Sequence, residues 1–323
     1  MKIVFITLIV LVCLFAAGLA FETYSRAQDD RAYPPPGNFL AVGDRSLHYQ
    51  CDGSSDQPLV LLEAGAGGSM LDWSGVIPLL SNKVRLCAYD RAGLGWSERG
   101  PAPRDLNALL NDTAQVLEAV RDEEPIIIVG HSFGGLIAQA LARQEPDRFA
   151  GLVLIDALEI EYLKGQRDQI GSQATIMGVG AALSVVGIPR LLGLAAAPPD
   201  ADEKVREAMV ARSLRTETLK TIAEEASATA GHIETFEALP PIRDDLPVLV
   251  VSRTQVPEGD DAAWFEAQRR LGELTTETTS SVAPTTNHYV QLASPELVSR
   301  AILDVVERTG SISRADPENV TSN

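Results

Sequence analysis

One stretch, PIIIVGHSFGG at positions 125–135, constrains the fold more than any other part of this chain. Ile126–Val129 is a run of β-branched residues, which is typical of a strand buried on both faces. The motif G-x-S-x-G follows at positions 130–134, and Leu136–Arg143 has a helical composition. A strand that turns this sharply into a helix needs glycine beside the bend, because a Cβ there would collide with neighbouring elements. The sequence therefore predicts a tight strand–turn–helix unit with Ser132 at its apex.

A serine at such an apex lies at the carboxyl edge of a sheet, close to the N-terminus of a helix. The partial positive charge of that terminus favours an oxyanion beside it. The motif alone recurs by chance, but a strand before it and a helix after it are the context in which its serine acts as a nucleophile. We therefore interpret Ser132 as a nucleophile.

Composition narrows the classes of function. The chain has 323 residues, 45% of them hydrophobic, which is enough for one large α/β domain with an insertion or for two ordinary domains. Its formal net charge of −17 argues against binding of nucleic acid and against broad electrostatic contact with anionic lipid. The three cysteines lack metal-ligand spacing and the four histidines do not cluster, so we expect neither a metal nor a cofactor.

The N-terminal segment predicts contact with a membrane. Ile3–Phe21 is apolar apart from Thr7 and follows the charged Lys2. As a helix it would span about 28 Å, close to the roughly 30 Å of a hydrocarbon core. We favour a transmembrane anchor, although the small residues at positions 18–20 also offer a cleavage site for a signal peptidase. In both cases the rest of the chain would be exported, either anchored on the extracytoplasmic side or secreted.

Four strand-like segments precede residues 125–135. Phe39–Val42 and Ser46–Cys51 alternate like the two strands of a hairpin, and Leu59–Glu63 and Val84–Tyr89 follow. Helical stretches lie between and after them. This alternation of strands and helices indicates a mostly parallel sheet.

Two cysteines fall in these predicted strands. Cys51 lies in the second and Cys87 in the fourth, and these strands are neighbours in the sheet order that the pattern suggests. An exported protein could join them by a disulfide. A bridge between adjacent strands is geometrically demanding, so two buried thiols are the alternative.

Three further motifs accompany the serine. EAGAGGS at 63–69 follows a strand directly, DRAGLGWS at 90–97 follows the next one, and Asn287-His288-Tyr289 precedes a helix at Leu297–Arg308. A glycine-rich turn such as 63–69 leaves backbone N–H groups free to face a nucleophile. Together these motifs occur in the order found in the α/β-hydrolase fold superfamily. The chain resembles bacterial ester hydrolases of that superfamily with an N-terminal membrane segment, over residues 39–308 apart from a middle insertion.

The resemblance implies both a fold and a site. The fold would be a mostly parallel eight-stranded α/β-hydrolase sheet with helices on both faces and a helical cap inserted after strand six. Ser132 would be the nucleophile and His288 the general base, and the backbone N–H groups of Phe133 and Ala66 would form the oxyanion hole. Ala64 stands where many relatives have a histidine. This difference leaves the backbone N–H donors in place.

The carboxylate that would orient His288 is ambiguous in the sequence. In most of the superfamily it follows the seventh strand, here Pro247–Ser252, and Glu258, Asp260 and Asp261 are available there. Those two aspartates also precede a predicted helix, where aspartate is a natural N-cap. Asp156 ends the sixth predicted strand at the catalytic edge, and some superfamily members place the acid there. We favour Asp156 and keep Asp260 and Asp261 as alternatives.

The remaining residues of these motifs have structural interpretations. Asp90 and Arg91 can satisfy buried backbone groups or each other. His131 lies inside the bend, but we expect its side chain to pack and to point away from the pocket of the nucleophile. His48 and His232 have no context that indicates a role.

These interpretations divide the chain into segments. Residues 1–21 would be the anchor or signal, 22–38 an extended proline-rich spacer, 39–308 the catalytic domain and 309–323 a disordered tail. From about 159 to 240 the alternation stops, and the apolar and then amphipathic stretches there resemble the helical cap of the family. The apolar part, residues 172–198, either packs against the core or forms an acyl-binding wall or a surface that dips into the nearby bilayer.

The sequence thus predicts a Ser-His-Asp hydrolase that cleaves a small-molecule carboxylic ester, with an apolar acyl group, through an acyl-enzyme. Thioesters, lactones and peptides are further substrate classes for the same machinery. A dehalogenase or epoxide hydrolase of this fold would need a carboxylate where Ser132 stands. The alternative from another class is a membrane-tethered ligand-binding protein with slow turnover.

Overall fold

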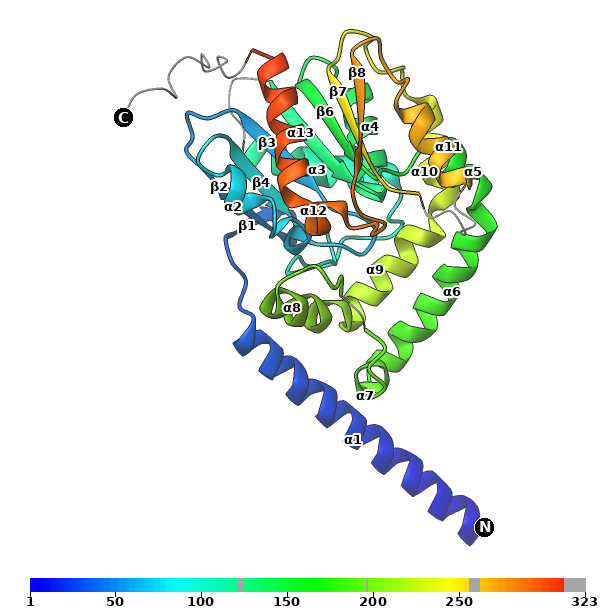
Figure 1. The fold of residues 1–323 in the computed structure, drawn as a ribbon. Coiled ribbons are helices and arrows are strands. Elements are labelled where there is room, and N and C mark those ends of the chain that lie inside the picture. The colour runs from blue at the N-terminus through cyan, green and yellow to red at the C-terminus, as the bar shows by residue number, and fades with distance from the viewer. Residues whose placement is uncertain (121–124, 196, 256–261, 311–323) are drawn as a thin grey trace.

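The computed structural model describes residues 1–120, 125–195, 197–255 and 262–310 (Figure 1). Within these ranges eight strands form one sheet: β1 (Asn38–Val42), β2 (Arg45–Asp52), β3 (Leu59–Glu63), β4 (Arg85–Tyr89), β5 (Ile126–His131), β6 (Phe149–Ile155), β7 (Val248–Arg253) and β8 (Thr278–Ala283). Their spatial order is β1-β2-β4-β3-β5-β6-β7-β8. β2 pairs antiparallel with both β1 and β4, and the other neighbours pair parallel. The predicted mostly parallel, eight-stranded sheet is confirmed.

The central strands β3 and β5 are buried along their whole length. Successive side chains of a strand point to opposite faces, so Leu61 and Ile128 join one apolar cluster and Leu62 and Val129 join the other. This two-sided burial is why both strands are uninterrupted apolar runs. The first cluster includes residues of α3 (Leu106–Val120), α4 (Phe133–Gln144) and α11 (Ala262–Leu271). The second includes residues of the 3-10 helix η1 (Met70–Trp73) and of α2 (Ile77–Leu80), α12 (Val290–Ala293) and α13 (Pro295–Arg308).

The insertion after β6 is helical, as expected for a cap. Its helices are α5 (Ile160–Gly165), α6 (Arg167–Ser184), α7 (Ile188–Leu191), α8 (Glu203–Ser213), α9 (Thr216–Ser227) and α10 (Thr229–Ala238). α6 packs along α9, and α10 contacts α3 of the core. In Figure 1 these helices lie at the end of the sheet that faces α1.

The N-terminal helix α1 (Lys2–Ala32) is longer than predicted. Its apolar part protrudes from the rest of the molecule (Figure 1), and it is long and apolar enough to cross a membrane, with a mean hydropathy of 3.0 over its most apolar window. The extended spacer predicted for residues 22–38 is wrong over residues 22–32, which continue this helix. Glutamate, arginine, alanine and glutamine favour a helix there, and Arg26 pairs with Glu22 one turn earlier at 2.9 Å. The prolines that prevent a helix begin only at Pro34.

Cys51 on β2 lies opposite Cys87 on β4, and the two form a disulfide with their Cα atoms 4.1 Å apart. Of the two alternatives that the sequence left open, the structure has the bridge. Cys13 in α1 is exposed and carries a free thiol. The tail predicted to be disordered, residues 309–323, lies outside the described residues from position 311 onward.

Candidate active site

Ser132 occupies the bend between β5 and α4. Its φ of 52° and ψ of −121° form a conformation that residues with a side chain rarely adopt. A Cβ on Gly130 would lie 2.4 Å from the carbonyl oxygen of Gly134, and a Cβ on Gly134 would lie 2.4 Å from that of Glu63. Only glycine fits at these two positions, so the motif enforces a bend that leaves the serine at the edge of the sheet.

Three predicted site residues meet at this edge. Ser132 Oγ lies 2.9 Å from His288 Nε2, and His288 Nδ1 lies 2.6 Å from Asp156 Oδ2. Because an ionised carboxylate can only accept, Nδ1 donates to Asp156, and Nε2 accepts from the serine hydroxyl. The structure therefore brings Ser132, His288 and Asp156 into one chain of hydrogen bonds. Asp260 and Asp261, the alternatives for the acid, lie outside the described residues.

Asp156 is fully buried and has two further partners that the sequence did not indicate. Trp264 Nε1 donates to its Oδ1 at 3.0 Å, and the Arg253 guanidinium forms an ion pair with its Oδ2. Burial by itself would raise the pKa of Asp156, but the hydrogen bonds from His288 and Trp264 and the attraction of Arg253 outweigh it and hold that pKa below its ordinary value. Asp156 is therefore ionised at neutral pH, and its orientation is fixed from three sides.

The two residues predicted to supply oxyanion donors lie beside the serine. The turn after β3 passes directly against the bend, since a Cβ on Gly65 would lie 3.2 Å from the Cβ of Ser132. Ala66, the next residue, lines the same cavity as Ser132. Phe133 is the first residue of α4, so its N–H has no acceptor within the helix.

Arg91 holds the turn after β3 in place. Its Nη1 donates to the carbonyl oxygen of Ala64 at 2.6 Å, and its Nη2 donates to that of Gly65 at 2.8 Å. It also forms ion pairs with Glu63 at 2.9 Å and with Glu225 of the cap helix α9 at 3.2 Å. Arg91 is only 2% exposed, so these partners replace water for its charge. One buried cation thus joins the end of β3, the turn and the cap.

The neighbouring Asp90 organises its own loop. It accepts from the backbone N–H groups of Met70 at 2.8 Å and Trp96 at 2.9 Å, and it lies 2.9 Å from His48 Nδ1. The prediction that Asp90 and Arg91 satisfy buried backbone groups is confirmed. His48, for which the sequence gave no context, is a buried part of this network.

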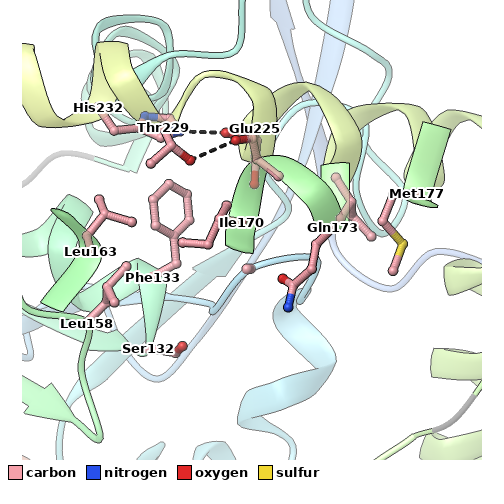
Figure 2. A pocket seen from close by; sticks show the side chains of 13 residues that line it. Ser132, Phe133, Leu158, Leu163, Ile170, Gln173, Met177, Glu225, Thr229 and His232 are labelled. Atoms are coloured by element: carbon pink, nitrogen blue, oxygen red, sulfur yellow. Dashed lines mark hydrogen bonds between the residues drawn. The ribbon is translucent and has the colours of Figure 1, made fainter. Parts of the chain in front are cut away.

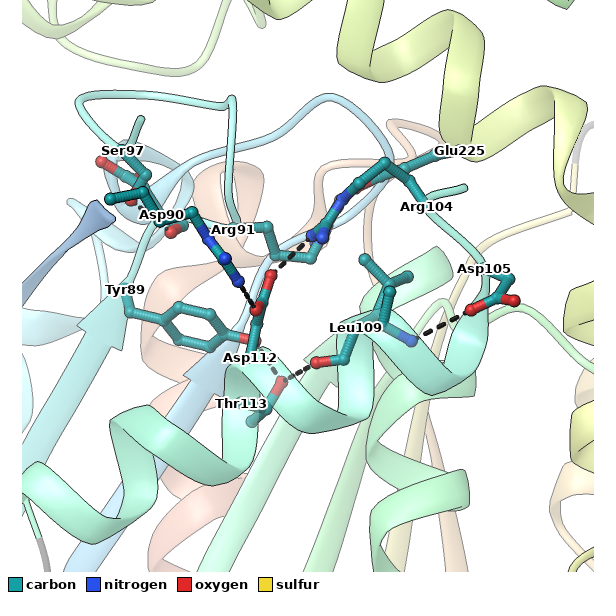
Figure 3. A network of polar contacts seen from close by, with 12 residues as sticks. Tyr89, Asp90, Arg91, Ser97, Arg104, Asp105, Leu109, Asp112, Thr113 and Glu225 are labelled. Carbon is teal, nitrogen blue, oxygen red and sulfur yellow. Dashed lines mark hydrogen bonds and ion pairs between the residues drawn. The ribbon is translucent and has the colours of Figure 1, made fainter. Parts of the chain in front are cut away.

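Helix α3 packs on one face of the sheet and supports the end of β4. Figure 3 shows Tyr89 reaching Thr113 and Arg104 reaching Asp112, at 2.6 Å and 2.8 Å respectively. All four side chains are buried. Tyr89 also donates to Glu63 and Asp112 also pairs with Arg45, so buried polar contacts fix the end of β4 against α3.

His131 and His232 are buried near the serine. His131 donates from Nε2 to the carbonyl oxygen of His288 at 2.9 Å, and burial lowers its pKa to about 3. This contact agrees with the prediction that His131 packs. His232 donates from Nε2 to the carbonyl oxygen of Glu225 at 2.8 Å, and its ring meets the Phe133 ring edge-on at 5.1 Å. Both imidazoles are neutral at physiological pH, since burial also lowers the pKa of His232.

A cavity of about 250 Å³, which we call the cap pocket, lies between Ser132 and the cap. Figure 2 shows the Phe133 ring standing between Leu163 and Ile170, beneath Thr229 and His232. Most of its lining is apolar: Ala66, Phe133, Leu158, Leu163, Ile170, Met177, Ile222 and Ala226. Gln173, Glu225, Thr229 and His232 add polar groups.

A second cavity of about 210 Å³, the histidine-side cavity, also reaches Ser132. It is lined by Ser132, His288, Tyr162, Arg253 and Trp264. Ser132 therefore stands between two spaces of different character, one mostly apolar and one beside the imidazole and a cation. Within the described residues, no group of three or more histidine, cysteine, aspartate or glutamate side chains is arranged to hold a metal ion.

Residues 57–175 match the family model described as alpha/beta hydrolase fold. The eight-stranded sheet with its surrounding helices has the α/β-hydrolase fold. Among solved structures, this chain is similar to a thermophilic esterase from Thermogutta terrifontis, with a TM-score of 0.60 and 19% identity over 84% of this chain and 99% of the esterase. It is also similar to the epoxide hydrolase CorEH, with a TM-score of 0.62 and 19% identity over 84% of this chain and 99% of that chain.

Curated relatives align with parts of this chain. It is 40% identical over 116 residues to a protein of Variovorax paradoxus (strain S110) named "Putative carbamate hydrolase RutD", covering 34% of this chain and 42% of that protein. Two further curated relatives are matched over 57% and 42% of their own length. The chain thus spans about half the length of the curated relatives that it matches.

Proposed function

We propose that this protein is a serine hydrolase that cleaves a carboxylic ester through a triad of Ser132, His288 and Asp156. The observation that carries the proposal is the continuous hydrogen-bond chain of 2.9 Å and 2.6 Å from the serine hydroxyl to a buried carboxylate. The strained backbone at Ser132 supports it further, because such strain is concentrated at functional sites.

In the first half of the reaction, Ser132 Oγ attacks the ester carbonyl carbon while its proton passes to His288 Nε2. The carbonyl π electrons move to the oxygen, which becomes an oxyanion between the N–H groups of Phe133 and Ala66. Asp156 stabilises the imidazolium and keeps its proton on Nδ1. Collapse of the tetrahedral intermediate breaks the bond to the alcohol oxygen, which leaves with the proton from Nε2. The product of this half is an acyl-enzyme on Ser132.

In the second half, a water molecule attacks the acyl carbon and gives a proton to His288 Nε2. The second tetrahedral intermediate collapses with return of that proton to Ser132 Oγ. The carboxylic acid departs and the free serine is restored. Since His288 must reach the leaving oxygen, the alcohol part of the substrate belongs in the histidine-side cavity and the acyl part in the cap pocket. The apolar lining of the cap pocket supports an apolar acyl group.

A carbamate is the second candidate substrate, favoured by the 40% identity to the Variovorax protein. Attack on a carbamate carbonyl passes through the same kind of tetrahedral intermediate, so the triad needs no change. An epoxide hydrolase is disfavoured in spite of the similarity to CorEH, because Ser132 stands where a carboxylate nucleophile would be needed. A ligand-binding protein with slow turnover is the alternative outside catalysis.

We further propose that residues 3–21 anchor the chain in a membrane and that residues 39–308, with a cap at about 159–240, form the catalytic domain on the extracytoplasmic side. The disulfide between Cys51 and Cys87 supports an exported domain, because such bonds persist mainly in oxidising compartments.

The test combines labelling by a fluorophosphonate with turnover of p-nitrophenyl esters and carbamates. We expect wild-type protein to be labelled and Ser132→Ala not to be. Asp156→Asn should lower kcat by about 10³–10⁴, as loss of the orienting carboxylate does in other triads. Asp260→Asn and Asp261→Asn are the matched controls and should change kcat by less than about threefold, because neither removes the carboxylate that accepts from His288.

Labelling that persists in Ser132→Ala would refute the nucleophile. A larger loss of kcat in Asp260→Asn or Asp261→Asn than in Asp156→Asn would show that Asp156 is not the triad acid and would assign that role to the residue with the larger loss. Labelling without measurable turnover of any substrate would favour the ligand-binding alternative. Circular dichroism of each variant verifies that it is folded.

A further inference from the structure

The outer surface of the cap has an apolar, uncharged face. Arg190 is the one charged residue in the sequence from 169 to 199, although charged residues make up 22% of the whole chain. Large apolar side chains on this face are more than one-third exposed: Ile176, Val179 and Leu183 on α6, and Leu191, Leu192 and Leu194 at and after α7. We call these six residues the apolar cap face.

Packing within the described residues does not account for this face. Ile176, Val179 and Leu183 are spaced by three and four residues, so they share one side of α6. The other side of the helix carries Ala174 and Ala181, which are buried. α6 is therefore apolar on two sides, and only one of them is covered by protein. A contiguous exposed apolar patch of this kind marks a contact with another phase or partner.

The apolar cap face begins where α1 touches the cap. A Cβ on Gly18 would lie 2.8 Å from the Cβ of Val186, and a Cβ on Gly187 would lie 2.8 Å from the Phe21 ring. Glu22 is 3% exposed and pairs with Arg190 at 3.1 Å. Arg190 therefore points to α1 and leaves no charge on the surface around α7.

These contacts set the depth of the cap relative to a bilayer that α1 crosses. As a helix, residues 2–21 are about 30 Å long, which matches the hydrocarbon core. With that segment in the core, the boundary lies near Phe21, and Val186 beside Gly18 lies about 5 Å inside it. Figure 1 shows α7 next to the middle of α1 and α6 running across the direction of α1 rather than along it. One side of α6 can therefore follow the surface of the bilayer.

We propose that the apolar cap face inserts into the boundary between acyl chains and headgroups of the same bilayer that α1 spans. The occupant of this face is lipid, because the helix that must be covered by lipid is packed directly against it. No cation is exposed there among the described residues, and the chain is strongly acidic, so the contact rests on apolar burial and does not require anionic lipid. The proposal rests on the proposed membrane anchor at residues 3–21 and is independent of the chemistry at Ser132.

The experiment measures the depth of single fluorescent labels in the full-length protein. In a Cys13→Ser background, where the Cys51–Cys87 disulfide is kept, Leu192→Cys is labelled with bimane. Lys204→Cys on α8 is the matched control, because it is exposed on the same cap but away from the proposed contact. The proteins are reconstituted in phosphatidylcholine vesicles with or without lipid that carries a nitroxide near the top of one acyl chain.

We expect the nitroxide lipid to quench the label at position 192 at least twofold and the label at position 204 by less than a tenth. Aqueous iodide should show the reverse order. Leu194→Cys repeats the measurement at a second exposed position in case Leu192→Cys is poorly folded. Equal quenching at positions 192 and 204, or free access of iodide to both, would overturn the proposal. Protection from iodide at 192 without nitroxide quenching would instead indicate a second protein chain on this face and would also overturn it.

Discussion

Glu225→Gln should remove the ion pair that links the cap helix α9 to Arg91, and through Arg91 to the turn with the proposed oxyanion donor. Glu224→Gln, on the same helix, is the matched control. Both oxygens of Glu225 accept from Arg91 at 3.2 Å, and both side chains are buried. The adjacent Glu224 pairs with Arg99, where the two side chains are 28% and 32% exposed. The two substitutions are chemically identical and differ only in the burial of the ion pair that they remove.

The structure sets the size of the difference. Removing one partner from a buried ion pair costs about 3–5 kcal/mol, because the other charge is left uncompensated. Arg91 keeps its ion pair with Glu63 and its two bonds to backbone carbonyls, so we expect about 2–3 kcal/mol for Glu225→Gln. Exposed pairs contribute about 0–1 kcal/mol, which is the expectation for Glu224→Gln. For a domain of this size, 2–3 kcal/mol lowers the melting temperature by about 5–10 °C.

The loss of kcat should also be larger for Glu225→Gln than for Glu224→Gln. Arg91 donates to the carbonyl oxygens of Ala64 and Gly65, so a looser Arg91 displaces the N–H of Ala66. Loss of a whole oxyanion donor costs about 10²–10³ in kcat, and a displaced donor should cost about tenfold. We expect Glu225→Gln to lower kcat more than it changes KM for a short p-nitrophenyl ester, and Glu224→Gln to leave both near wild type.

Thermal unfolding by circular dichroism in detergent and steady-state hydrolysis are the two assays. Melting temperatures of the two variants within 2 °C of each other would refute the reasoning about burial. A change in KM alone would refute the link from Arg91 to the oxyanion turn.

Three further expectations concern stability. Burial raises the pKa of Asp72 to about 7, so between about pH 4 and 7 the folded state keeps a proton that the unfolded state releases. The free energy of unfolding therefore falls as the pH rises from about 4 to 7, and it stays lower above pH 7. Asp72→Asn should therefore stabilise the fold against urea at pH 8, by at most about 4 kcal/mol, and little at pH 4, whereas an equal effect at both pH values would contradict this. Reduction of Cys51–Cys87, a separation of 36 residues, should cost about 4 kcal/mol in urea unfolding, and a variant with serine at both positions should not respond to reductant. Gly134→Ala, whose Cβ would lie 2.4 Å from a carbonyl oxygen of β3, should cost more than about 2 kcal/mol and prevent fluorophosphonate labelling, while Gly178→Ala, with open space around it, should do neither. Normal labelling of Gly134→Ala would show that the bend tolerates a side chain.

The bend at Ser132 was predictable because its requirements are local and steric. A Cβ on Gly130 or on Gly134 would lie 2.4 Å from a backbone carbonyl oxygen, so a residue with a side chain does not fit at either position. The sheet was predictable for a similar reason, since a strand buried on both faces must be apolar at every position. In both cases the signal lies within about ten adjacent residues.

The parts that sequence did not reveal depend on contacts between distant residues. Trp264 and Arg253 reach Asp156 from positions 108 and 97 residues away, and no local pattern distinguishes them. The same holds for Glu225, which meets Arg91 across 134 residues. A chain offers many such pairings, and only the folded arrangement selects among them.

The prediction of an extended spacer failed over residues 22–32 for a different reason. The proline run at positions 34–36 suggested an extended spacer, but proline acts only on its own position and on the residue before it. The eleven residues 22–32, between the apolar segment and the residue before Pro34, were free to continue the helix. Tertiary contacts then stabilise this part, since Glu22 is buried against Arg190 and Arg26 donates to Thr216 of α9 at 2.6 Å.

These contacts also limit how the cap can move. The cap is attached at its start by Glu159, which accepts from Arg270 of α11 at 2.6 Å, and further along by the ion pair between Glu225 and the buried Arg91. α1 attaches it a third time, through Glu22 and Arg190. A swing of the whole cap would break all three attachments, each of which involves a buried carboxylate.

Access to Ser132 therefore depends on local rearrangement and not on opening of the cap as one body. α6 is the element where such a rearrangement has the largest effect, because Met177 lines the cap pocket while the adjacent Ile176 belongs to the apolar cap face. If that face rests on lipid, an apolar ester dissolved in the bilayer reaches α6 before any other part of the site. The helix would then act both as the contact with lipid and as the wall that the substrate must pass, so the same apolar residues would set the orientation of the protein and the class of ester that it admits.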